Sequence, residues 1–191
     1  MSQLDRETVE NAFRTMGEYL RDRKILGEIV VYGGSAIMLQ FDWRSSTHDV
    51  DARITSDSVH GHVQTAVHYA ATKLGLQQSW LNEAVASYVS KSQTSTDTIS
   101  YGMYPDYFRP GLRVLLATPR YLLAMKLMAI SRHDRDFNDA ANLAMEVGVQ
   151  TYDDMMELVG GFYPEDDLPE MVRLRFHDLE EVIANKKAFS P

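Results

Sequence analysis

Apolar and polar positions near the start of the chain recur with helical spacing. Between residues 5 and 23, apolar side chains follow one another at steps of three and four, with charged side chains between them. They are Val9, Ala12, Phe13, Met16 and Leu20. This spacing predicts an amphipathic helix whose apolar stripe covers a sheet.

Two strand patterns follow this helix. The first, Glu28 to Tyr32, is a short β-branched run that ends at a pair of glycines, and residues 35–40 then read as a helical turn. The second runs from Asp49 to Ile54 and alternates, with Val50, Ala52 and Ile54 on one face and the carboxylates on the other. The expected order is strand, glycine turn, helix, strand.

Further along, the patterns become increasingly helical. A helix is expected from about Ser58 to Leu74, ended by Gly75, and residues 76–81 read as an edge strand or an extended segment. Residues 87–100 are rich in Ser and Thr and predict a surface loop or a loosely paired hairpin. Another strand is expected at residues 111–118, where Thr118 and Pro119 supply the N-cap and the first residue of a helix.

The remaining patterns are helical and are punctuated by glycine and proline. Helices are expected at residues 120–130, 134–147, 152–159 and 168–186. The fold class is therefore α/β (α+β), with a small mixed sheet flanked by helices in residues 1–117. A helical region of residues 118–191 is expected to pack on that core.

Composition excludes several classes of protein. The chain has 191 residues, 45% of them hydrophobic and 24% charged, which is typical of a globular protein. With no cysteine, it has no disulfide, thiol nucleophile or thiolate zinc site. No run of apolar residues is long enough to span a membrane, and the first residues do not resemble a signal peptide, so we expect a cytoplasmic protein with no membrane partner.

The net charge of −8 argues against a broad phosphate-binding surface, since such surfaces depend on Lys and Arg. It does not exclude a small anionic ligand, because a divalent cation held by carboxylates dominates the local field.

The candidate chemistry begins with Asp49 and Asp51. Residues two apart on a strand point to the same side, so both carboxylates can face one site. Paired carboxylates suit Mg²⁺ or Mn²⁺ bound together with substrate phosphates. An exposed acidic strand end is the alternative for a motif this short, and nucleotide-sugar glycosyltransferases also use an Asp-x-Asp pair.

The turn Gly33-Gly34-Ser35 lies between the first of these strands and a helix. Glycines let a backbone approach a phosphate closely, a helix start offers free N–H groups, and Ser35 adds a hydroxyl donor. Together with the two aspartates, this turn supplies the two halves of a nucleoside triphosphate site.

These residues resemble the motif of the nucleotidyltransferase superfamily with the DNA polymerase beta-type fold. The match comprises the glycine turn, Arg44, Thr47, Asp49 and Asp51. Within that superfamily the chain is most similar to the AbiEii-type toxin nucleotidyltransferases and their bacterial relatives. A helical lysine followed by an arginine and an Asp-x-x-Asp extends the similarity, as does the segment Trp80-Leu81-Asn82. The helical residues are Lys126, Arg132, Asp136 and Asp139.

The resemblance implies an enzyme that transfers a nucleoside monophosphate from a triphosphate such as ATP to an acceptor hydroxyl and releases pyrophosphate. Asp49 and Asp51 would be catalytic and hold the metal, and Lys126 would neutralise phosphate charge. Nucleotide-binding positions would be Gly33, Gly34, Ser35, Arg44, Thr47, Arg132, Asp136 and Asp139. The acceptor could be an RNA such as tRNA, a protein or a small molecule, and an antitoxin could be a partner.

One element of the superfamily motif has no obvious counterpart. Many members carry a third carboxylate on a later strand, and the strand at residues 112–118 contains no acid. Glu83, Asp97 and Asp106 are the candidates. If none reaches the site, three alternatives stay open: a single metal ion, ligands supplied by the substrate, or a nucleotide-binding or interaction module of a toxin–antitoxin-like system that transfers nothing.

Several of these residues also have plainer interpretations. Lys126 alone reads equally well as a surface lysine, and Asp136 and Asp139 are spaced to form helical ion pairs with Arg132 and Arg135. The spacing of the histidines, such as His60-x-His62, matches none of the usual zinc signatures.

Overall fold

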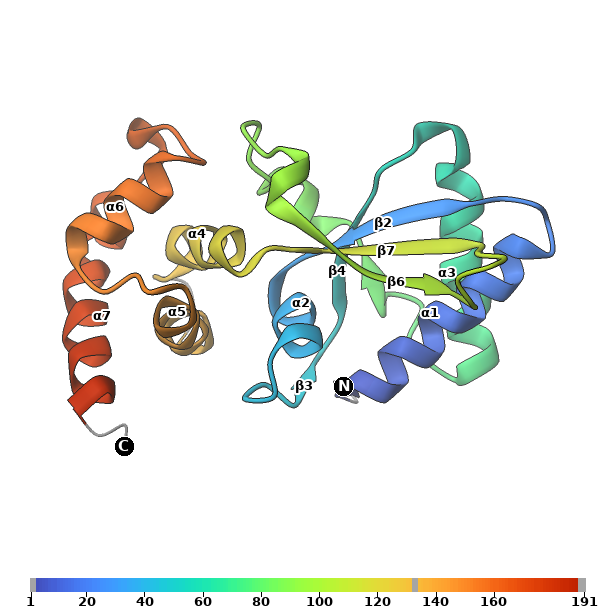
Figure 1. The fold of residues 1–191 in the computed structure, drawn as a ribbon, viewed down its shortest axis with the longest axis horizontal. Coiled ribbons are helices and arrows are strands. Elements are labelled where there is room, and N and C mark those ends of the chain that lie inside the picture. The colour runs from blue at the N-terminus through green and yellow to red at the C-terminus, as the bar shows by residue number, and fades with distance from the viewer. Residues whose placement is uncertain (1–2, 132–133, 189–191) are drawn as a thin grey trace. The chain divides into compact units, whose positions relative to one another are not determined.

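The computed structural model describes residues 3–131 and 134–188 and divides into two compact units (Figure 1). The sheet unit comprises residues 1–87 and 98–117, and the helical unit comprises residues 88–97 and 118–191. The Ser/Thr-rich segment 88–97 thus groups with the helices that follow it, although it precedes the last two strands.

A five-stranded mixed sheet forms the centre of the sheet unit, as the sequence predicted. Its strands lie in the order β5-β4-β2-β7-β6. Their bounds are β2 Gly27–Val31, β4 Val50–Ile54, β5 Leu81–Asn82, β6 Thr98–Tyr104 and β7 Leu112–Ala117. The pairs β2–β7 and β4–β5 are parallel, whereas β2–β4 and β6–β7 are antiparallel. The predicted α/β class is confirmed.

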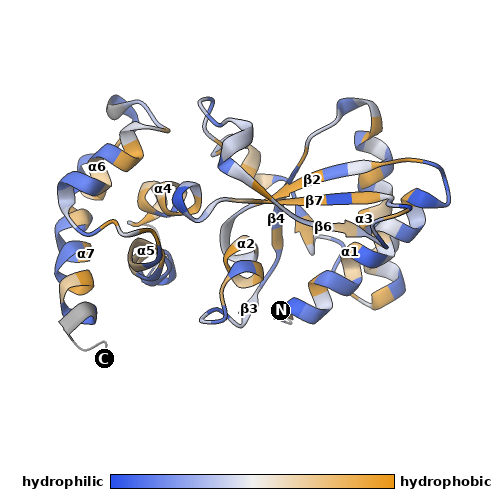
Figure 2. Ribbon diagram, viewed as in Figure 1, coloured by the Kyte–Doolittle hydropathy of each residue, from blue (hydrophilic) through white to orange (hydrophobic). Residues whose placement is uncertain are grey.

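Helices α1 (Arg6–Arg21) and α3 (His60–Leu74) pack against each other and against the sheet. The buried face of α1 carries the apolar stripe read from the sequence, and Phe13 and Met16 are fully buried. Figure 2 shows the apolar colour concentrated on the central strands and on the helix surfaces that meet them. This packing removes apolar area from water and is the main stabilising contribution to the unit.

The ends of these helices follow local rules. Asp5 caps α1, because its Oδ1 accepts a hydrogen bond from the Thr8 N–H at 2.8 Å. A single 3₁₀ turn, Asp57–Val59, leads into α3, and Gly75 ends that helix with φ 68°. A separate two-stranded sheet joins β1 (Leu4–Asp5) to β3 (Ser46–Thr47).

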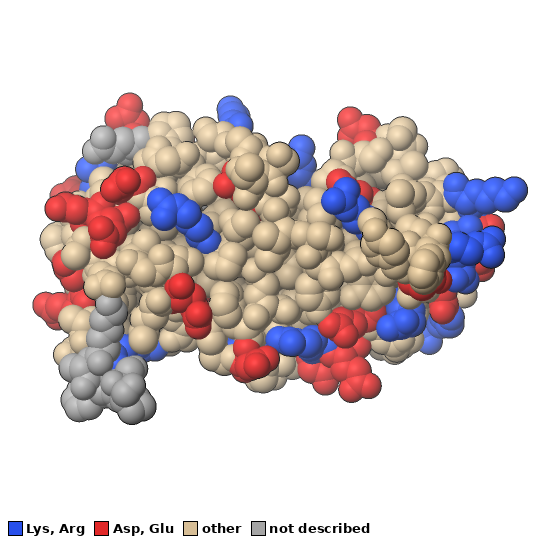
Figure 3. Space-filling model, viewed as in Figure 1, with Lys and Arg blue, Asp and Glu red and all other residues tan. Residues whose placement is uncertain are grey.

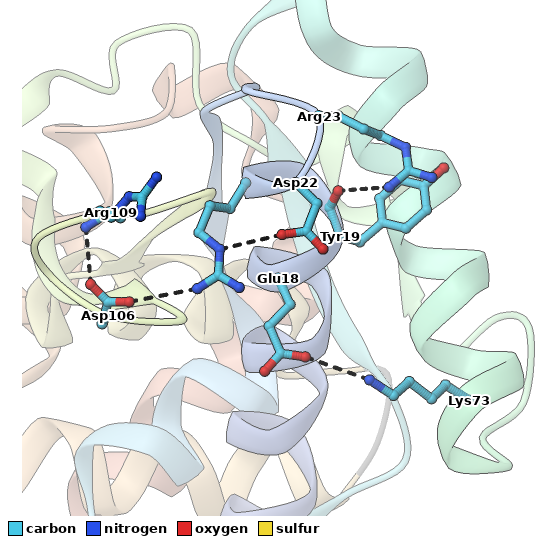
Figure 4. A network of polar contacts seen from close by, with 8 residues as sticks. Glu18, Tyr19, Asp22, Arg23, Lys73, Asp106 and Arg109 are labelled. Atoms are coloured by element: carbon cyan, nitrogen blue, oxygen red, sulfur yellow. Dashed lines mark hydrogen bonds and ion pairs between the residues drawn. The ribbon is translucent and has the colours of Figure 1, made fainter.

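Polar contacts link α1 to its neighbours at the end of the sheet where β2 and β7 begin (Figure 4). Nζ of Lys73 in α3 lies 3.5 Å from Oε2 of Glu18. Nη1 of Arg21 lies 3.7 Å from Oδ2 of Asp106 in the loop between β6 and β7. The glycine turn that follows β2 lies at the other end of that strand, roughly 17 Å away at the usual rise per residue. The basic residues drawn in Figure 4 therefore belong to a different part of the surface from the glycine turn.

The structure differs from the sequence prediction at the two edge strands. Residues 87–100 were expected to be a loop or a loose hairpin, but β6 begins at Thr98 and pairs with the whole of β7. Of the edge strand or extended segment expected at 76–81, only β5 forms as a strand, and it contains two residues and starts at Leu81. Short 3₁₀ turns, Ala84–Ser87 and Ser95–Asp97, occupy parts of the chain between β5 and β6.

The helical unit has four α-helices within its described residues. They are α4 Pro119–Ala129, α5 Asp134–Val147, α6 Tyr152–Gly160 and α7 Glu170–Ala188, with a 3₁₀ turn at Glu165–Asp167. Thr118 caps α4 by accepting from the Tyr121 N–H at 3.3 Å, and Pro119 is its first residue, as predicted. No helix in residues 3–131 or 134–188 has the length and apolar character needed to cross a membrane.

Candidate functional site

The first turn of α2 (Gly33–Gln40), which follows β2 and contains both glycines, is the first part of the candidate site. Gly33 has φ 59°, in the left-handed region where only glycine is free of strain. A Cβ added at Gly33 would lie 2.8 Å from Oδ2 of Asp51. The carboxylate of Asp51 therefore lies directly against the glycine turn, and the left-handed backbone angle favours a glycine here.

Arg44 lies against the next residue of the same turn. A Cβ added at Gly34 would come within 2.8 Å of the Arg44 Cζ. The guanidinium of Arg44 and the carboxylate of Asp51 thus occupy the space that side chains at two successive positions would fill. The turn brings a cation and an anion to one small region of the sheet edge.

Asp49 precedes the first residue of β4, and two contacts fix its position. Asn82 donates from Nδ2 to Oδ2 of Asp49 at 3.0 Å, and the Thr47 hydroxyl donates to the Asp49 carbonyl oxygen at 3.0 Å. Asp49 and Asp51 are both half-buried, while Val50 and Ala52 are fully buried on the opposite face of β4. The alternation read from the sequence is therefore present, with the two carboxylates on the face away from the core.

Ser35 is placed differently from Asp51. Its side chain is buried, and its hydroxyl donates to the carbonyl oxygen of Tyr32 at 2.9 Å. Tyr32 is the N-cap residue of α2 and makes no side-chain capping hydrogen bond, so backbone N–H groups of the first turn are left for other partners. The backbone of the turn is thus a better candidate for anion binding than the Ser35 hydroxyl in this conformation.

Lys126 forms a cluster within the helical unit. Its Nζ on α4 lies 2.6 Å from Oδ1 of Asp136 and 3.0 Å from Oδ2 of Asp139, both on α5. The side-chain exposures are 12% for Lys126, 17% for Asp136 and 7% for Asp139. The lysine read from the sequence as a phosphate ligand thus shares its charge with two carboxylates that face it. Arg132 lies outside the described residues.

The three candidates for a third carboxylate all have local partners elsewhere. Glu83 accepts from the Ile54 N–H at 3.1 Å and lies 2.8 Å from Nε2 of His60. Asp97 accepts from the Thr94 N–H, and Asp106 accepts from backbone N–H groups in the loop between β6 and β7. These contacts are made with residues other than Asp49 and Asp51.

The residue beside Asp51 on the neighbouring strand is Asn82, which pairs with it in the parallel β4–β5 register. Reasoning from the sequence noted the segment Trp80-Leu81-Asn82 but gave Asn82 no role. Its hydrogen bond to Asp49 makes it part of the candidate site.

Within residues 3–131 and 134–188, no three His, Asp or Glu side chains are grouped so that they could hold a metal ion by themselves. The carboxylates of Asp49 and Asp51 are hard oxygen donors that suit Mg²⁺, an ion that keeps several coordination positions for water or phosphate. The donor set fits a magnesium ion that takes its remaining ligands from a bound nucleotide.

Comparison of the chain with protein-family models, with curated proteins and with solved structures found no significant match.

Proposed function

We propose that the chain is a metal-dependent nucleotidyltransferase whose nucleotide and metal site lies at the glycine turn. The observation that carries the proposal is the approach of the Asp51 carboxylate to Gly33, with Asp49 two residues earlier and Arg44 against Gly34. A triphosphate site needs three kinds of group. Carboxylates hold the divalent cation, and a glycine turn at a helix start and a guanidinium bind the phosphate oxygens.

In this proposal Asp49 and Asp51 hold Mg²⁺ or Mn²⁺ together with the nucleotide phosphates. The ion, when bound, offsets the charge of the phosphates and of the leaving pyrophosphate. The backbone N–H groups of the turn bind phosphate oxygens, and Arg44 adds a fixed positive charge beside them. These residues hold the triphosphate in one orientation, with its α-phosphorus facing the acceptor hydroxyl.

The proposed reaction needs only the triphosphate and the acceptor as reactants. An acceptor hydroxyl oxygen forms a bond to the α-phosphorus, the bond between that phosphorus and the bridging oxygen breaks, and pyrophosphate leaves. The proton of the hydroxyl is released to solvent. The acceptor, on the sequence resemblance, is an RNA or a protein hydroxyl, and an antitoxin is the expected protein partner.

Charge distribution gives no separate support to a nucleic-acid acceptor. On the face drawn in Figure 3, Lys and Arg side chains are interspersed with Asp and Glu side chains. Because binding to a phosphate backbone depends on neutralising several phosphates together, this face does not favour RNA over protein as the acceptor.

A second function is favoured by one observation. The sheet presents the amide of Asn82, rather than a carboxylate, beside Asp51. A site with two carboxylates and a neighbouring amide would also suit a module that binds a metal–nucleotide complex without transferring it, as part of a toxin–antitoxin-like pair.

Incubation of the protein with each labelled triphosphate, Mg²⁺ or Mn²⁺ and total cellular RNA tests the first function. Label should enter RNA or protein with the wild type and be lost with Asp49→Asn/Asp51→Asn. The matched control is Asp57→Asn, which removes an exposed carboxylate in the turn before α3 and should leave incorporation unchanged.

The same samples distinguish the two functions by thermal stability. A nucleotide that raises the melting temperature of the wild type but not of the double variant, with no label transferred, supports the binding module. Absence of both incorporation and nucleotide-dependent stabilisation would remove both proposals.

A further inference from the structure

Asn82 occupies the sheet position closest to the carboxylate pair on a neighbouring strand. It lies opposite Asp51 in the parallel register of β4 and β5, while its side chain reaches Asp49. Adjacent strands are about 4.8 Å apart, so a residue here can contribute directly to whatever Asp49 and Asp51 bind. A carboxylate at this position would complete a cluster of three.

The orientation of the Asn82 amide is set by both of its polar atoms. Oδ1 accepts from the Ala84 N–H at 2.9 Å, and Nδ2 donates to Oδ2 of Asp49 at 3.0 Å. Only the oxygen can accept the first bond and only the nitrogen can donate the second, so the two contacts assign the same orientation. Asn82 therefore holds Asp49 through its Oδ2 atom.

The strand that carries Asn82 is anchored on both sides. Before it, the Val50 N–H donates to the Trp80 carbonyl oxygen at 2.7 Å, and the buried Trp80 donates from Nε1 to Val67 O at 3.1 Å. After it, Glu83 bonds to the backbone of Ile54. A strand of two residues is thus kept in a fixed register, and Asn82 presents its amide from a rigid position.

We propose that Asn82 is the positioning residue of Asp49, and that its neutral side chain makes the site take a divalent cation only together with nucleotide phosphates. The inference rests on the proposed function. Two carboxylates supply too few oxygens and too little charge to retain Mg²⁺ strongly against water. Phosphate oxygens of the nucleotide supply the remaining ligands, so cation and nucleotide bind as one complex.

Water-proton relaxation enhancement by Mn²⁺ tests this, because Mn²⁺ on the protein tumbles slowly and is distinguished from Mn²⁺ on free nucleotide. The titrations use the full chain with and without triphosphate analogues of each base that carry a methylene between the α- and β-phosphorus. We expect the wild type to bind Mn²⁺ at least about tenfold more tightly with one analogue than alone.

Two variants at position 82 separate positioning from charge. Asn82→Asp adds a third carboxylate and should bind Mn²⁺ without nucleotide at least about tenfold more tightly than the wild type. Asn82→Ala removes the bond to Asp49 and should weaken Mn²⁺ binding with the analogue by roughly 10- to 100-fold, the usual effect of losing a partner of a metal ligand. Circular dichroism confirms that each variant is folded.

The outcomes distinguish the inference from the function on which it rests. Wild-type binding that needs no nucleotide, or Asn82 variants that bind Mn²⁺ as the wild type does, would overturn the inference while leaving the proposed function in place. Binding with the analogue that persists in Asp49→Asn/Asp51→Asn would overturn the proposed function itself, and the inference with it.

Discussion

The carboxylate of Asp51 and the backbone of Gly33 lie so close that a Cβ at position 33 would displace the carboxylate. A Cβ at position 33 would be 2.8 Å from Oδ2 of Asp51, and the φ of 59° would strain any other residue. Asp51 on β4 thus lies in direct contact with the glycine turn that follows β2. The function proposed for the chain depends on this contact.

Gly33→Ala should therefore affect both stability and binding. The left-handed φ alone costs about 1 to 2 kcal/mol for a residue with a Cβ. Crowding adds to this cost only as far as the Asp51 carboxylate, the end of a flexible side chain, has to turn away from the added Cβ. We expect a lower free energy of unfolding in urea and loss of nucleotide-dependent thermal stabilisation.

Gly75→Ala is the matched control for this substitution. Gly75 has φ 68° but no atom within 4 Å of an added Cβ, so the variant carries the backbone strain without the crowding. It should lose about 1 to 2 kcal/mol and still respond to nucleotide. Equal effects of the two variants on stability and nucleotide response would show that the contact with Asp51 is unimportant.

Glu83, one of the three candidates for a third carboxylate, contacts a backbone N–H group and a histidine in the structure. As a third catalytic carboxylate, it could not be replaced by glutamine without loss of transfer. In the structure it accepts from the Ile54 N–H and contacts His60, and the glutamine oxygen can accept the same N–H bond. Glu83→Gln should therefore keep label incorporation, whereas Asp49→Asn should abolish it.

Glu83→Ala provides the structural counterpart to that measurement. It leaves the partly buried Ile54 N–H without its partner, which should lower the free energy of unfolding by about 1 to 3 kcal/mol. If Glu83→Gln lost transfer while remaining as stable as the wild type, Glu83 would have to be regarded as catalytic.

The strands with a strong pattern were predictable from the sequence, and the weakly patterned edges were not. β4 shows strict alternation, and Val50, Ala52 and Ile54 are buried as expected. In β6 no residue is buried, so its sequence carries little periodic signal and its pairing with β7 decides its structure. β5 has only two residues, which is too short for any pattern to reveal.

The candidate site was predictable to the extent that it depends on local motifs. The glycine turn, Asp49 and Asp51 were found because each follows from a short run of residues. Asn82 was assigned no role because its position opposite Asp51 arises from a pairing between segments about thirty residues apart. Pairing over such a distance is set by packing, for which a single sequence gives no direct signal.

Lys126 illustrates the same difficulty in the helical unit. Helical spacing suggested partners on the same helix for Asp136 and Asp139, whereas both approach a lysine on the preceding helix. Lys126→Met would leave two largely buried carboxylates without this cation. We expect a loss of about 3 kcal/mol or more in the free energy of unfolding, measured in urea at pH 7.

Two further variants test whether burial is the cause. Lys73→Met removes a lysine whose 3.5 Å contact with Glu18 is exposed, and should change stability by less than about 1 kcal/mol. Lys126→Met/Asp136→Asn/Asp139→Asn removes all three charges and should recover part of the loss. A triple variant that is stable but transfers no label would indicate that this cluster of Lys126, Asp136 and Asp139 also takes part in nucleotide transfer.

Tyr104 should make the sheet unit sensitive to alkaline pH. Burial, followed by the nearby charge of Glu10, raises the pKa of Tyr104 to about 12. An unfolded chain has a tyrosine pKa of about 10, so the folded state favours the neutral phenol. Its contribution to stability is complete below pH 10 and is lost as the pH rises from about 10 to about 12, because only the unfolded state releases the proton there.

Urea unfolding at intervals between pH 9 and pH 12 measures this effect. The free energy of unfolding should fall less steeply with pH in Tyr104→Phe than in the wild type, since phenylalanine cannot ionise and can keep the ring contact with Phe13 at 5.7 Å between centroids. Tyr107→Phe changes a tyrosine that is 77% exposed and should follow the wild-type curve. Parallel curves for the wild type and Tyr104→Phe across this range would mean that the buried phenol does not contribute to the pH dependence.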